Sequence, residues 1–530
     1  MKGRNKIYTP LLLSIACAIG LLLGARLNFD PSDELFSGNP KKQKLNRLID
    51  YIDYEYVDDV NTDSIVDLTV NKILENLDPH SVYIPKEEYA SVTENMKGDF
   101  VGIGVSFYTI QDTIVVIKAL EGGPSEKIGI RGGDRILYAN GNKLFNQGIS
   151  NDSITKQLKG KENTKVSLKI LRRGIEDLLT FKVTRGKVPL KSVDASYMLT
   201  RNLGYIKINR FAETTYKEFR DAIGELKKRG ATQIALDLRD NPGGYLAEAI
   251  NIADEFIKGD KLILYTKNKS GAIEETYAQR KGEFENGKVF VLINENSASA
   301  SEVVAGALQD NDVGIIVGRR SYGKGLVQRE MELGDGSAVR LTIARYYTPT
   351  GRSIQKPYNN GNESYFNDYM RRYENGELKN LDSIQVNDSL RYVTPGGKVV
   401  YGGGGIIPDV FVPKDTSSEK EKLTFLLRGG YMDKYVFDLL EKDREYYNSI
   451  PKSEYRERIE ITEEMLRNFD RYLRQMGVRI NLNGEEHKPL LKKYLKAEMA
   501  QQLFGTNAFE RYLNEDDRII EKVIELSEEN

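Results

Sequence analysis

Residues 288–310 read KVFVLINENSASASEVVAGALQD, which is a strand, a polar loop and a helix in succession. The apolar run Val289–Ile293 predicts a buried strand, and the segment that continues to Leu308 predicts a helix. A buried strand that leads into a helix is typical of an α/β layer with crossover connections. Ligand sites in such sheets lie where the strands end, so the loop Asn294–Ser299 is a candidate site.

The flanking sequence repeats this alternation of strands and helices over residues 188–355. A second polar loop, Arg239–Gly244, follows the buried strand Ile234–Leu238. Because both loops follow buried strands, we expect them at the same edge of one sheet. The segments that carry the pattern are LGYIKIN (203–209), a helix over about 215–229, QIALDLRDNPGG (233–244), a helix over about 246–257 and GIIVGRR (314–320).

The chain of 530 residues exceeds what one hydrophobic core usually organises, and its length predicts roughly three to four domains. Its hydrophobic content of 40% and charged content of 29% are ordinary for a globular protein. The formal net charge is −1, so no overall positive field would attract nucleic acid. We therefore expect no nucleic-acid partner.

The N-terminus, residues 1–28, has the pattern of a secretory signal or a single-pass anchor. Basic residues precede an apolar run from Leu11 to Ala25 that is short for a spanning helix. No small-x-small cleavage site follows, which favours an uncleaved anchor. We expect an exported, periplasmic or cell-envelope protein that contacts the membrane only through this segment. The single cysteine, Cys17, lies within it, so disulfides, structural zinc sites and thiol catalysis are excluded downstream.

Residues 33–97 are predicted to form a small helical unit, because apolar residues recur at helical spacing from about residue 43. The unit contains the helix-breaking stretch LDPHSVYIP (77–85), in which Asp78-Pro79 ends a helix. His80 lies in this breaker. Its position beside Pro79 favours a packing or capping role over catalysis.

From residue 98 the sequence changes to short β-like runs separated by glycines. The stretch GGPSEKIGIRGGDRILYANG (122–141) places a short helix before a glycine turn and a strand. With the loop Gly102-Ile103-Gly104-Val105, it makes residues 98–187 resemble a PDZ domain. The resemblance implies that this loop offers backbone N–H groups to the terminal carboxylate of a peptide, while a strand edge pairs with the peptide.

Three alternating serines, Ser297, Ser299 and Ser301, precede the helix of the opening stretch. A hydroxyl at a helix start lies among unpaired N–H groups and the positive end of the helix dipole, which suits an oxyanion. The alternative is that these serines only cap the helix. However, one cap needs one serine, and the small residues between them would let a substrate backbone approach.

A nucleophilic serine needs a base, and the only two histidines, His80 and His487, lie outside the α/β segment. Lysine is the remaining base type, and SYGKGLVQ (321–328) holds Lys324 between two glycines after a buried strand. Burial must lower the lysine pKa from about 10.4 to about 7–8 before it can accept a proton. A neutral hydrogen-bonding partner such as Gln328 is compatible with that shift.

With SASEVVAGALQD and YGKGLVQ, the chain closely resembles the carboxyl-terminal processing peptidases, exported serine proteases with a Ser–Lys dyad and a PDZ domain. The resemblance spans about residues 43–413. It implies that Ser299 is the nucleophile, Lys324 the general base and Gln328 an assisting residue. LDLRDNPGG (236–244) matches the loop that supplies an oxyanion N–H, which the resemblance places at Gly243 alongside Ala300. No metal or cofactor is implied.

We therefore expect a multidomain α/β protein: a helical unit, a PDZ domain, a Ser–Lys peptidase core of the crotonase/ClpP-like type (188–413) and a helical C-terminal extension (414–530). The polar insertion 359–393 and the extension have no counterpart in the family pattern; the extension fits packing or dimerisation, which leaves a homo-oligomer open. Asp310 fits capping or salt bridging better than catalysis. The expected partners are proteins or peptides with free apolar C-termini.

Two other functions stay open at this stage. Oxyanion-type backbone donors in an α/β sheet also suit a crotonase-like acyl-CoA enzyme, although such enzymes need neither a PDZ domain nor the Ser–Lys spacing. A catalytically inactive PDZ scaffold is the second alternative.

Overall fold

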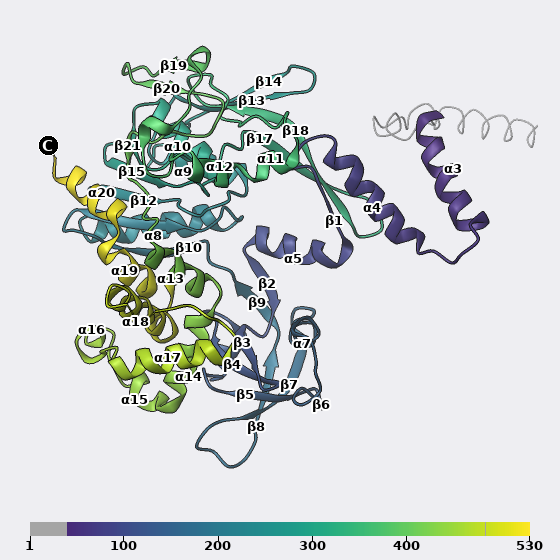
Figure 1. Ribbon diagram of the computed structural model, residues 1–530, viewed down its shortest axis with the longest axis vertical. Coiled ribbons are helices and arrows are strands. Elements are labelled where there is room, and N and C mark those ends of the chain that lie inside the picture. Colours follow the sequence, from purple (N-terminus) through teal and green to yellow (C-terminus); the bar gives the residue numbers. More distant parts are fainter. Residues whose placement is uncertain (1–39, 483, 530) are drawn as a thin grey trace, which may run out of the picture. The chain divides into compact units, whose positions relative to one another are not determined.

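The structure is a computed structural model that describes residues 40–482 and 484–529 (Figure 1). The apolar segment Leu11–Ala25, for which we expect a targeting role, lies outside these residues. Within the described part of the chain, no helix combines the length and the apolar character needed to cross a bilayer.

Contacts within the chain divide it between Asn76 and Leu77 into two units. The first unit carries helices α3 (Pro40–Glu55) and α4 (Thr62–Glu75). Asn61 precedes α4, and its side chain accepts a hydrogen bond from a backbone N–H in the first turn (3.0 Å), which fixes the start of the helix.

The segment 77–97, which we expected to belong to the helical unit, is part of the larger second unit. It contains strand β1 (Val82–Ile84), which pairs antiparallel with β18 (Ala338–Tyr347), and then helix α5 (Lys86–Lys97). The chain turns ahead of β1 because the Asp78 carboxylate accepts hydrogen bonds from two backbone N–H groups that follow it (2.8 and 2.9 Å). This local turn and the β-branched residues of β1 override the helical spacing.

The PDZ-like segment forms an antiparallel sheet with the strand order β3-β4-β5-β7-β8, in which β6 pairs with β5, and β2 pairs separately with β9. Side chains alternate along β7, so that Val166, Leu168 and Ile170 are buried in the domain's own core. The elements are β2 (Asp99–Gly102), β3 (Val105–Ile110), β4 (Thr113–Ala119), α6 (Pro124–Lys127), β5 (Arg135–Ala139), β6 (Asn142–Lys143), α7 (Asn151–Leu158), β7 (Lys165–Leu171), β8 (Leu179–Thr184) and β9 (Gly186–Pro189).

A six-stranded sheet in the order β10-β11-β12-β15-β16-β21 forms the α/β core. Apart from the antiparallel pair β10 and β11, neighbouring strands run parallel. Helices α8, α9 and α10 share a hydrophobic cluster with one face, and α20 packs on the other, so the central strands are buried apolar runs. The elements are β10 (Val193–Met198), β11 (Leu203–Ile208), α8 (Thr215–Lys228), β12 (Gln233–Asp237), α9 (Leu246–Asp254), β15 (Lys288–Ile293), α10 (Ala300–Asp310), β16 (Gly314–Gly318), β21 (Val410–Phe411) and α20 (Arg518–Glu528).

A second, antiparallel sheet follows the order β1-β18-β13-β14, and β17 pairs with β18. The polar insertion 359–393 folds into two short helices and two 3-10 turns, and its end forms a hairpin with β20. The elements are β13 (Leu262–Asn268), β14 (Ile273–Tyr277), β17 (Leu326–Glu332), α11 (Asn362–Phe366), α12 (Asp368–Glu374), η1 (Leu381–Ser383), η2 (Asp388–Leu390), β19 (Arg391–Val393) and β20 (Val399–Tyr401).

The C-terminal extension is helical, as the sequence predicts, and has a hydrophobic core of its own. It also packs against the PDZ-like segment, where Phe437 of α14 lies against Val115 and Ile117 of β4. Its last helix, α20, belongs to the α/β core. The other elements are α13 (Ser418–Arg428), α14 (Tyr431–Lys442), α15 (Arg444–Asn448), α16 (Tyr455–Arg458), α17 (Glu463–Gln475), α18 (Lys488–Phe504), α19 (Thr506–Leu513) and η3 (Asn514–Asp516).

Asp310, the last residue of α10, forms a fully buried ion pair with Arg352 (Oδ1 to Nη2, 2.7 Å). Replacing Asp310 with Ala would leave the Arg352 charge buried without its carboxylate, so we expect a loss of about 3–5 kcal/mol in the free energy of unfolding. Urea denaturation followed by circular dichroism measures this change. The exposed Asp382 serves as the control, and Asp382→Ala should change stability by less than about 0.5 kcal/mol. An unchanged urea midpoint for Asp310→Ala would contradict a stabilising role for the ion pair between Asp310 and Arg352.

Candidate active site

The loops that follow the parallel strands β12 and β15 meet in the structure. The Ala298 N–H donates to the Asn241 carbonyl (3.0 Å), which joins one loop to the other. Gly243 approaches so closely that a Cβ added to it would lie 2.8 Å from the Cβ of Ser299. Its φ of 101° also disfavours any other residue. The two polar loops predicted from the sequence therefore form one site at the carboxyl edge of the sheet.

Ser299 occupies the N-cap position of α10, with a φ of 55° and a ψ of −114°. L-residues rarely adopt this conformation, and such strain concentrates at functional sites where the surrounding structure holds it. The Glu302 carboxylate accepts the Ser299 N–H (2.9 Å). The N–H of Ala300 has no acceptor among the residues that the structure describes, so it is available to bind an oxyanion near the positive end of the helix.

The two neighbouring serines have structural contacts. The Ser297 hydroxyl is buried, accepts the Asn294 N–H (2.9 Å) and donates to the Leu238 carbonyl (2.8 Å). The Ser301 hydroxyl is also buried and donates to a carbonyl of the loop after β12 (3.0 Å). Each of these two hydroxyls thus holds the loops together, whereas Ser299 is the one of the three serines with a strained backbone.

Lys324 lies between Gly323 and Gly325, just before β17, and Gln328 lies on β17. The Lys324 Nζ donates to the Gln328 Oε1 (2.8 Å), and the Gln328 Nε2 donates in turn to the His80 carbonyl. The structure therefore brings together the lysine and the glutamine that we selected from the sequence. His80 contributes to this arrangement through its backbone.

Burial and, to a smaller extent, the positive charge of Arg340 lower the pKa of Lys324 from its usual value to about 8. The carboxylates of Glu302 and Asp78 oppose this shift by favouring the ammonium form. A lysine with a pKa of about 8 is partly neutral near neutral pH and can accept a proton, which an ordinary lysine cannot do efficiently.

Two buried side chains connect the serine loop with the lysine loop. Glu302 Oε2 accepts both the Ser299 N–H (2.9 Å) and the Lys324 N–H (2.8 Å), while Oε1 accepts the Gly323 N–H (2.7 Å). The Tyr346 hydroxyl lies 3.2 Å from the Ser299 carbonyl and 2.9 Å from the Lys324 carbonyl. We did not select either residue from the sequence. The S-x-x-E spacing of Ser299 and Glu302 is a capping-box signal that could have identified Glu302.

The Gly243 N–H, which we expected to bind the oxyanion, donates to the Asn241 Oδ1 in this structure (2.9 Å). Gly243 nevertheless lies at the site, since its added Cβ would also come within 2.9 Å of the Ala300 nitrogen. A substrate oxygen would have to compete with the Asn241 amide for this N–H. Of the two donors that we expected, the Ala300 N–H is therefore the one without an acceptor in residues 40–482 and 484–529.

The polar insertion 359–393 contacts the loop that carries Lys324. Arg372, which is 2% exposed, donates to the carbonyls of Arg320 and Ser321 (3.2 and 2.8 Å), directly ahead of Gly323 and Lys324. Tyr365, also from the insertion, places its hydroxyl 2.7 Å from the His80 Nε2. No periodic or motif signal in the polar sequence 359–393 indicated these contacts.

The PDZ loop Gly102–Val105 is fixed through its carbonyl groups. The Ile103 and Gly104 carbonyls accept the N–H groups of Ser125 and Leu120 (both 2.9 Å). No acceptor for the N–H groups of Ile103 and Gly104 is found in the described part of the chain. The next strand, β3, is the edge of its sheet, so both the loop and the strand can receive a peptide.

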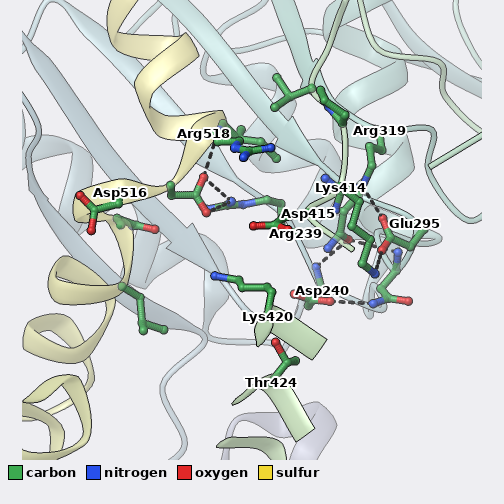
Figure 2. A pocket seen from close by; sticks show the side chains of 18 of the residues that line it. Arg239, Asp240, Glu295, Arg319, Lys414, Asp415, Lys420, Thr424, Asp516 and Arg518 are labelled. Atoms are coloured by element: carbon green, nitrogen blue, oxygen red, sulfur yellow. Dashed lines mark hydrogen bonds and ion pairs between the residues drawn. The ribbon is translucent and has the colours of Figure 1, made fainter. Parts of the chain in front are cut away.

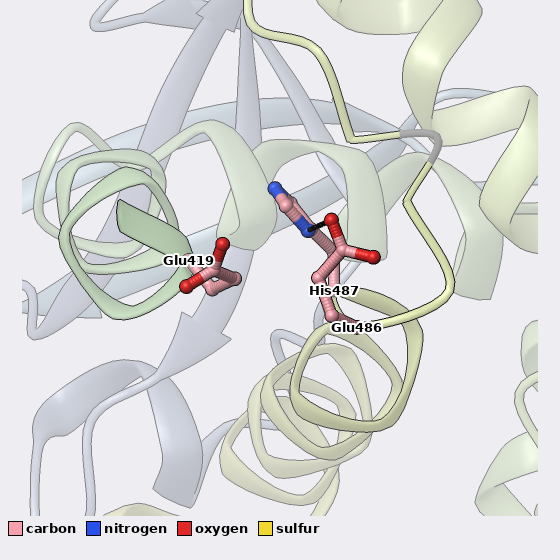
Figure 3. Close-up of side chains that lie close together, drawn as sticks. All are labelled: Glu419, Glu486 and His487. Atoms are coloured by element: carbon pink, nitrogen blue, oxygen red, sulfur yellow. Dashed lines mark ion pairs between the residues drawn. The ribbon is translucent and has the colours of Figure 1, made fainter. Parts of the chain in front are cut away.

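One cluster in the described residues has the composition of a metal site, and it lies in the C-terminal extension (Figure 3). The potential ligand atoms of Glu419, Glu486 and His487 lie within 4.8 Å of one another. However, the Lys422 Nζ lies 3.3 Å from the His487 Nε2, and the Glu486 carboxylate lies 3.4 Å from the Nδ1. An ammonium at the histidine nitrogen disfavours a cation there, so these contacts fit a buried histidine whose Nε2 is hydrogen-bonded to Lys422.

Comparison with known families gives three matches. The profile of peptidase family S41 matches residues 202–361, which contain Ser299 and Lys324, and that of the PDZ domain matches residues 101–184. The profile of a family of unknown function (DUF8443) matches residues 423–505.

The chain is 33% identical over 359 residues to the carboxy-terminal processing protease CtpA of Bacillus subtilis (strain 168), covering 67% of this chain and 76% of that protein. It is 36% identical over 313 residues to a probable CtpA-like serine protease of Staphylococcus aureus (strain MRSA252), covering 59% of this chain and 62% of that protein. The chain thus spans under two thirds of the staphylococcal relative. The solved photosystem II D1 C-terminal processing protease shares 26% identity and a TM-score of 0.36, covering 70% of this chain and 86% of that one.

A serine series tests the assignment of the nucleophile. We expect Ser299→Ala and Lys324→Ala each to abolish peptide cleavage, and the double variant to be no worse, because nucleophile and base act as one unit. Ser297→Ala and Ser301→Ala should keep measurable turnover. Ser297→Ala should lose about 1–3 kcal/mol of stability, because a buried N–H and a carbonyl lose their partner. Cleavage rates and thermal melts measure both effects, and full activity in Ser299→Ala would end the assignment.

The pH dependence of kcat/KM tests the base. Below a pKa of about 8, Lys324 carries its proton and cannot accept one, so the rate should fall as the pH falls through that value and level off above it. Lys324→Arg should stay inactive, because arginine does not deprotonate. Gln328→Ala should only weaken activity. A flat profile between about pH 6 and 10 together with an active Arg variant would exclude the lysine base.

Proposed function

This chain belongs to peptidase family S41, and on that premise we propose that it is a serine endopeptidase that cleaves proteins at or near their C-termini, with Ser299 as nucleophile and Lys324 as base. One observation carries the proposal. A strained serine at a helix start and a buried lysine of lowered pKa both donate their backbone N–H to a single oxygen of Glu302. No cofactor is needed for the chemistry that follows.

In the acylation step, the neutral Lys324 Nζ accepts the Ser299 hydroxyl proton while the Ser299 Oγ bonds to the substrate carbonyl carbon. The carbonyl oxygen becomes an oxyanion, and the Ala300 N–H at the start of α10 stabilises it. The Gly243 N–H is the second donor when the substrate oxygen replaces the Asn241 Oδ1 as its acceptor. The Lys324 ammonium then donates its proton to the departing amine, and the peptide bond breaks.

In the deacylation step, a water molecule attacks the ester carbonyl while Lys324 accepts a proton from it. The second tetrahedral intermediate collapses, Ser299 regains its proton from Lys324, and the new carboxylate leaves. Gln328 supports both steps by holding the Lys324 Nζ in place with its side-chain oxygen.

The PDZ domain reads the substrate tail in this proposal. The N–H groups of Ile103 and Gly104 bind a terminal carboxylate, and strand β3 pairs with the preceding residues. Thr109 of β3 donates to the side chain of Asn151 at the start of α7 (2.7 Å), so this helix lies beside the strand that pairs with the peptide. We propose small apolar residues as the preferred substrate end.

We also propose that the protein acts outside the cytoplasm, in the periplasm or the cell envelope. This proposal rests on the sequence of residues 1–28, whose basic start and apolar run from Leu11 to Ala25 are typical of an export signal or anchor. Protease accessibility of the chain in intact and osmotically shocked cells would test it.

The two alternative functions predict different products. An inactive PDZ scaffold would bind a peptide with a free C-terminus and leave it intact, and a crotonase-like enzyme would act on an acyl thioester. Incubating the chain with unfolded casein and reading the products by mass spectrometry separates these cases from an endopeptidase. New peptide termini that vanish in Ser299→Ala would support the proposal, and intact casein would contradict it.

Amidation of the substrate tail tests the reading of C-termini. Hydrogen bonds to a charged group contribute about 1.5–3 kcal/mol, so amidating the tail should lower kcat/KM roughly tenfold to hundredfold. In Gly104→Ala, the added Cβ would lie 3.2 Å from the Gly123 Cα and disturb the loop, so the ratio should approach one. The measurement compares free-acid and amidated forms of one peptide. Equal rates in the unaltered chain would rule out this role of the PDZ domain.

A further inference from the structure

The C-terminal extension, residues 414–530, contacts both loops of the active site through charged side chains (Figure 2). A cavity of about 490 Å³ lies among these side chains. The ion pairs are Lys414 with Glu295 (2.5 Å), Arg428 with Asp240 (3.3 Å) and Asp517 with Arg239 (2.9 Å).

These ion pairs differ in their expected strength. The side chains of Arg428 and Asp240 are 66% and 48% exposed, and such surface pairs contribute little. Arg239 is only 12% exposed, and its guanidinium is held on two sides. Its Nε donates to the fully buried Asp237 (2.9 Å), while its Nη1 donates to both carboxylate oxygens of Asp517 (2.9 Å each). The pairing with Asp517 is therefore the most defined contact of the extension with the loop after β12.

Asp517 is itself held in place. Its carboxylate accepts the N–H groups of Ile519 and Ile520 (3.0 and 3.1 Å) and so caps helix α20. Both isoleucines are buried in the hydrophobic cluster that includes Phe290 of β15. The position of the carboxylate is therefore fixed by the face of the sheet on which α20 packs.

Arg239 is the first residue of the loop 239–244, in which Gly243 lies against Ser299. The rest of this loop is held by the Asn294 side chain, which accepts the Asp240 N–H (3.0 Å), and by other contacts within the core. Asp517 differs because it lies far outside residues 202–361, the segment that matches the peptidase family. The family-matched segment alone thus lacks one of the anchors of its own oxyanion loop.

We propose that Asp517 is a positioning residue for the peptidase reaction, because it holds Arg239 and thereby keeps the loop 239–244 against Ser299. The C-terminal extension is then a working part of the active site. The inference rests on the proposed function, since it concerns the donors that stabilise the oxyanion. Removing one oxyanion donor lowers kcat by about 10²–10³, and loosening the loop that carries it should cost part of that factor.

Asp517→Asn tests the proposal in the full chain. Asparagine is as good a helix cap as aspartate, so α20 should keep its start while Arg239 loses a carboxylate. We expect kcat for an internally quenched peptide with a free Ala-Ala terminus to fall about tenfold, with KM changed less than about twofold. Asp517→Glu restores the charge and should recover at least half of the lost kcat. The melting temperature of Asp517→Asn should stay close to that of the unaltered chain.

Asp516→Asn is the matched control, because Asp516 is the preceding residue, is 79% exposed and pairs with Lys493. It should retain the kcat of the unaltered chain. The proposal is overturned if Asp517→Asn keeps full kcat or if Asp516→Asn loses as much kcat as Asp517→Asn does. It is also overturned if Asp517→Asn lowers the melting temperature together with kcat and Asp517→Glu does not recover the lost kcat. Failure of the unaltered chain to cleave the peptide would instead refute the proposed function.

Discussion

The fully buried carboxylate of Glu302 accepts hydrogen bonds from both catalytic loops, and the geometry of the site depends on it. It receives the N–H groups of Ser299, Gly323 and Lys324 and the hydroxyl of Ser321. A buried carboxylate destabilises the folded state unless hydrogen-bond donors satisfy it. Because the donors to Glu302 come from both loops, the carboxylate holds the two loops beside each other. Ser299, whose backbone is strained, donates one of these hydrogen bonds at the start of α10.

A second constraint is the burial of Lys324. Moving its pKa from 10.5 to about 8 corresponds to about 3 kcal/mol against the charged form. The fold produces this burial with residues from distant parts of the chain. Gln328 of β17 binds the Nζ, and its own amide is held by the His80 carbonyl. The pairing of β1 with β18 brings His80 to this place, so the segment 77–97 contributes to the position of the Lys324 side chain.

Local signals explain what the sequence could predict. Buried strands followed by helices predicted the α/β core, and the two glycines around Lys324 together with Gln328 predicted a pair that the structure brings into contact. Strand β1 was missed because its pairing with β18 outweighs the helical spacing around it. Asp517 was missed because its partner Arg239 is 278 residues away, and a charge pair between distant segments leaves no periodic trace. Reactive side chains within a motif can therefore be predicted from the sequence more readily than the distant contacts that hold the motif in position.

The C-terminal extension packs against both the PDZ domain and the six-stranded sheet, and the two apolar contacts differ in size. Against the PDZ domain, its buried apolar contact is Phe437 with Val115 and Ile117. Against the sheet, α20 shares a much larger cluster that fixes Asp517. Small, partly polar contacts between domains permit relative motion, whereas a large apolar contact resists it. Any rearrangement that accompanies binding of a substrate tail should therefore occur on the PDZ side, while the anchor of Arg239 stays in place and the oxyanion loop keeps its shape through the catalytic cycle.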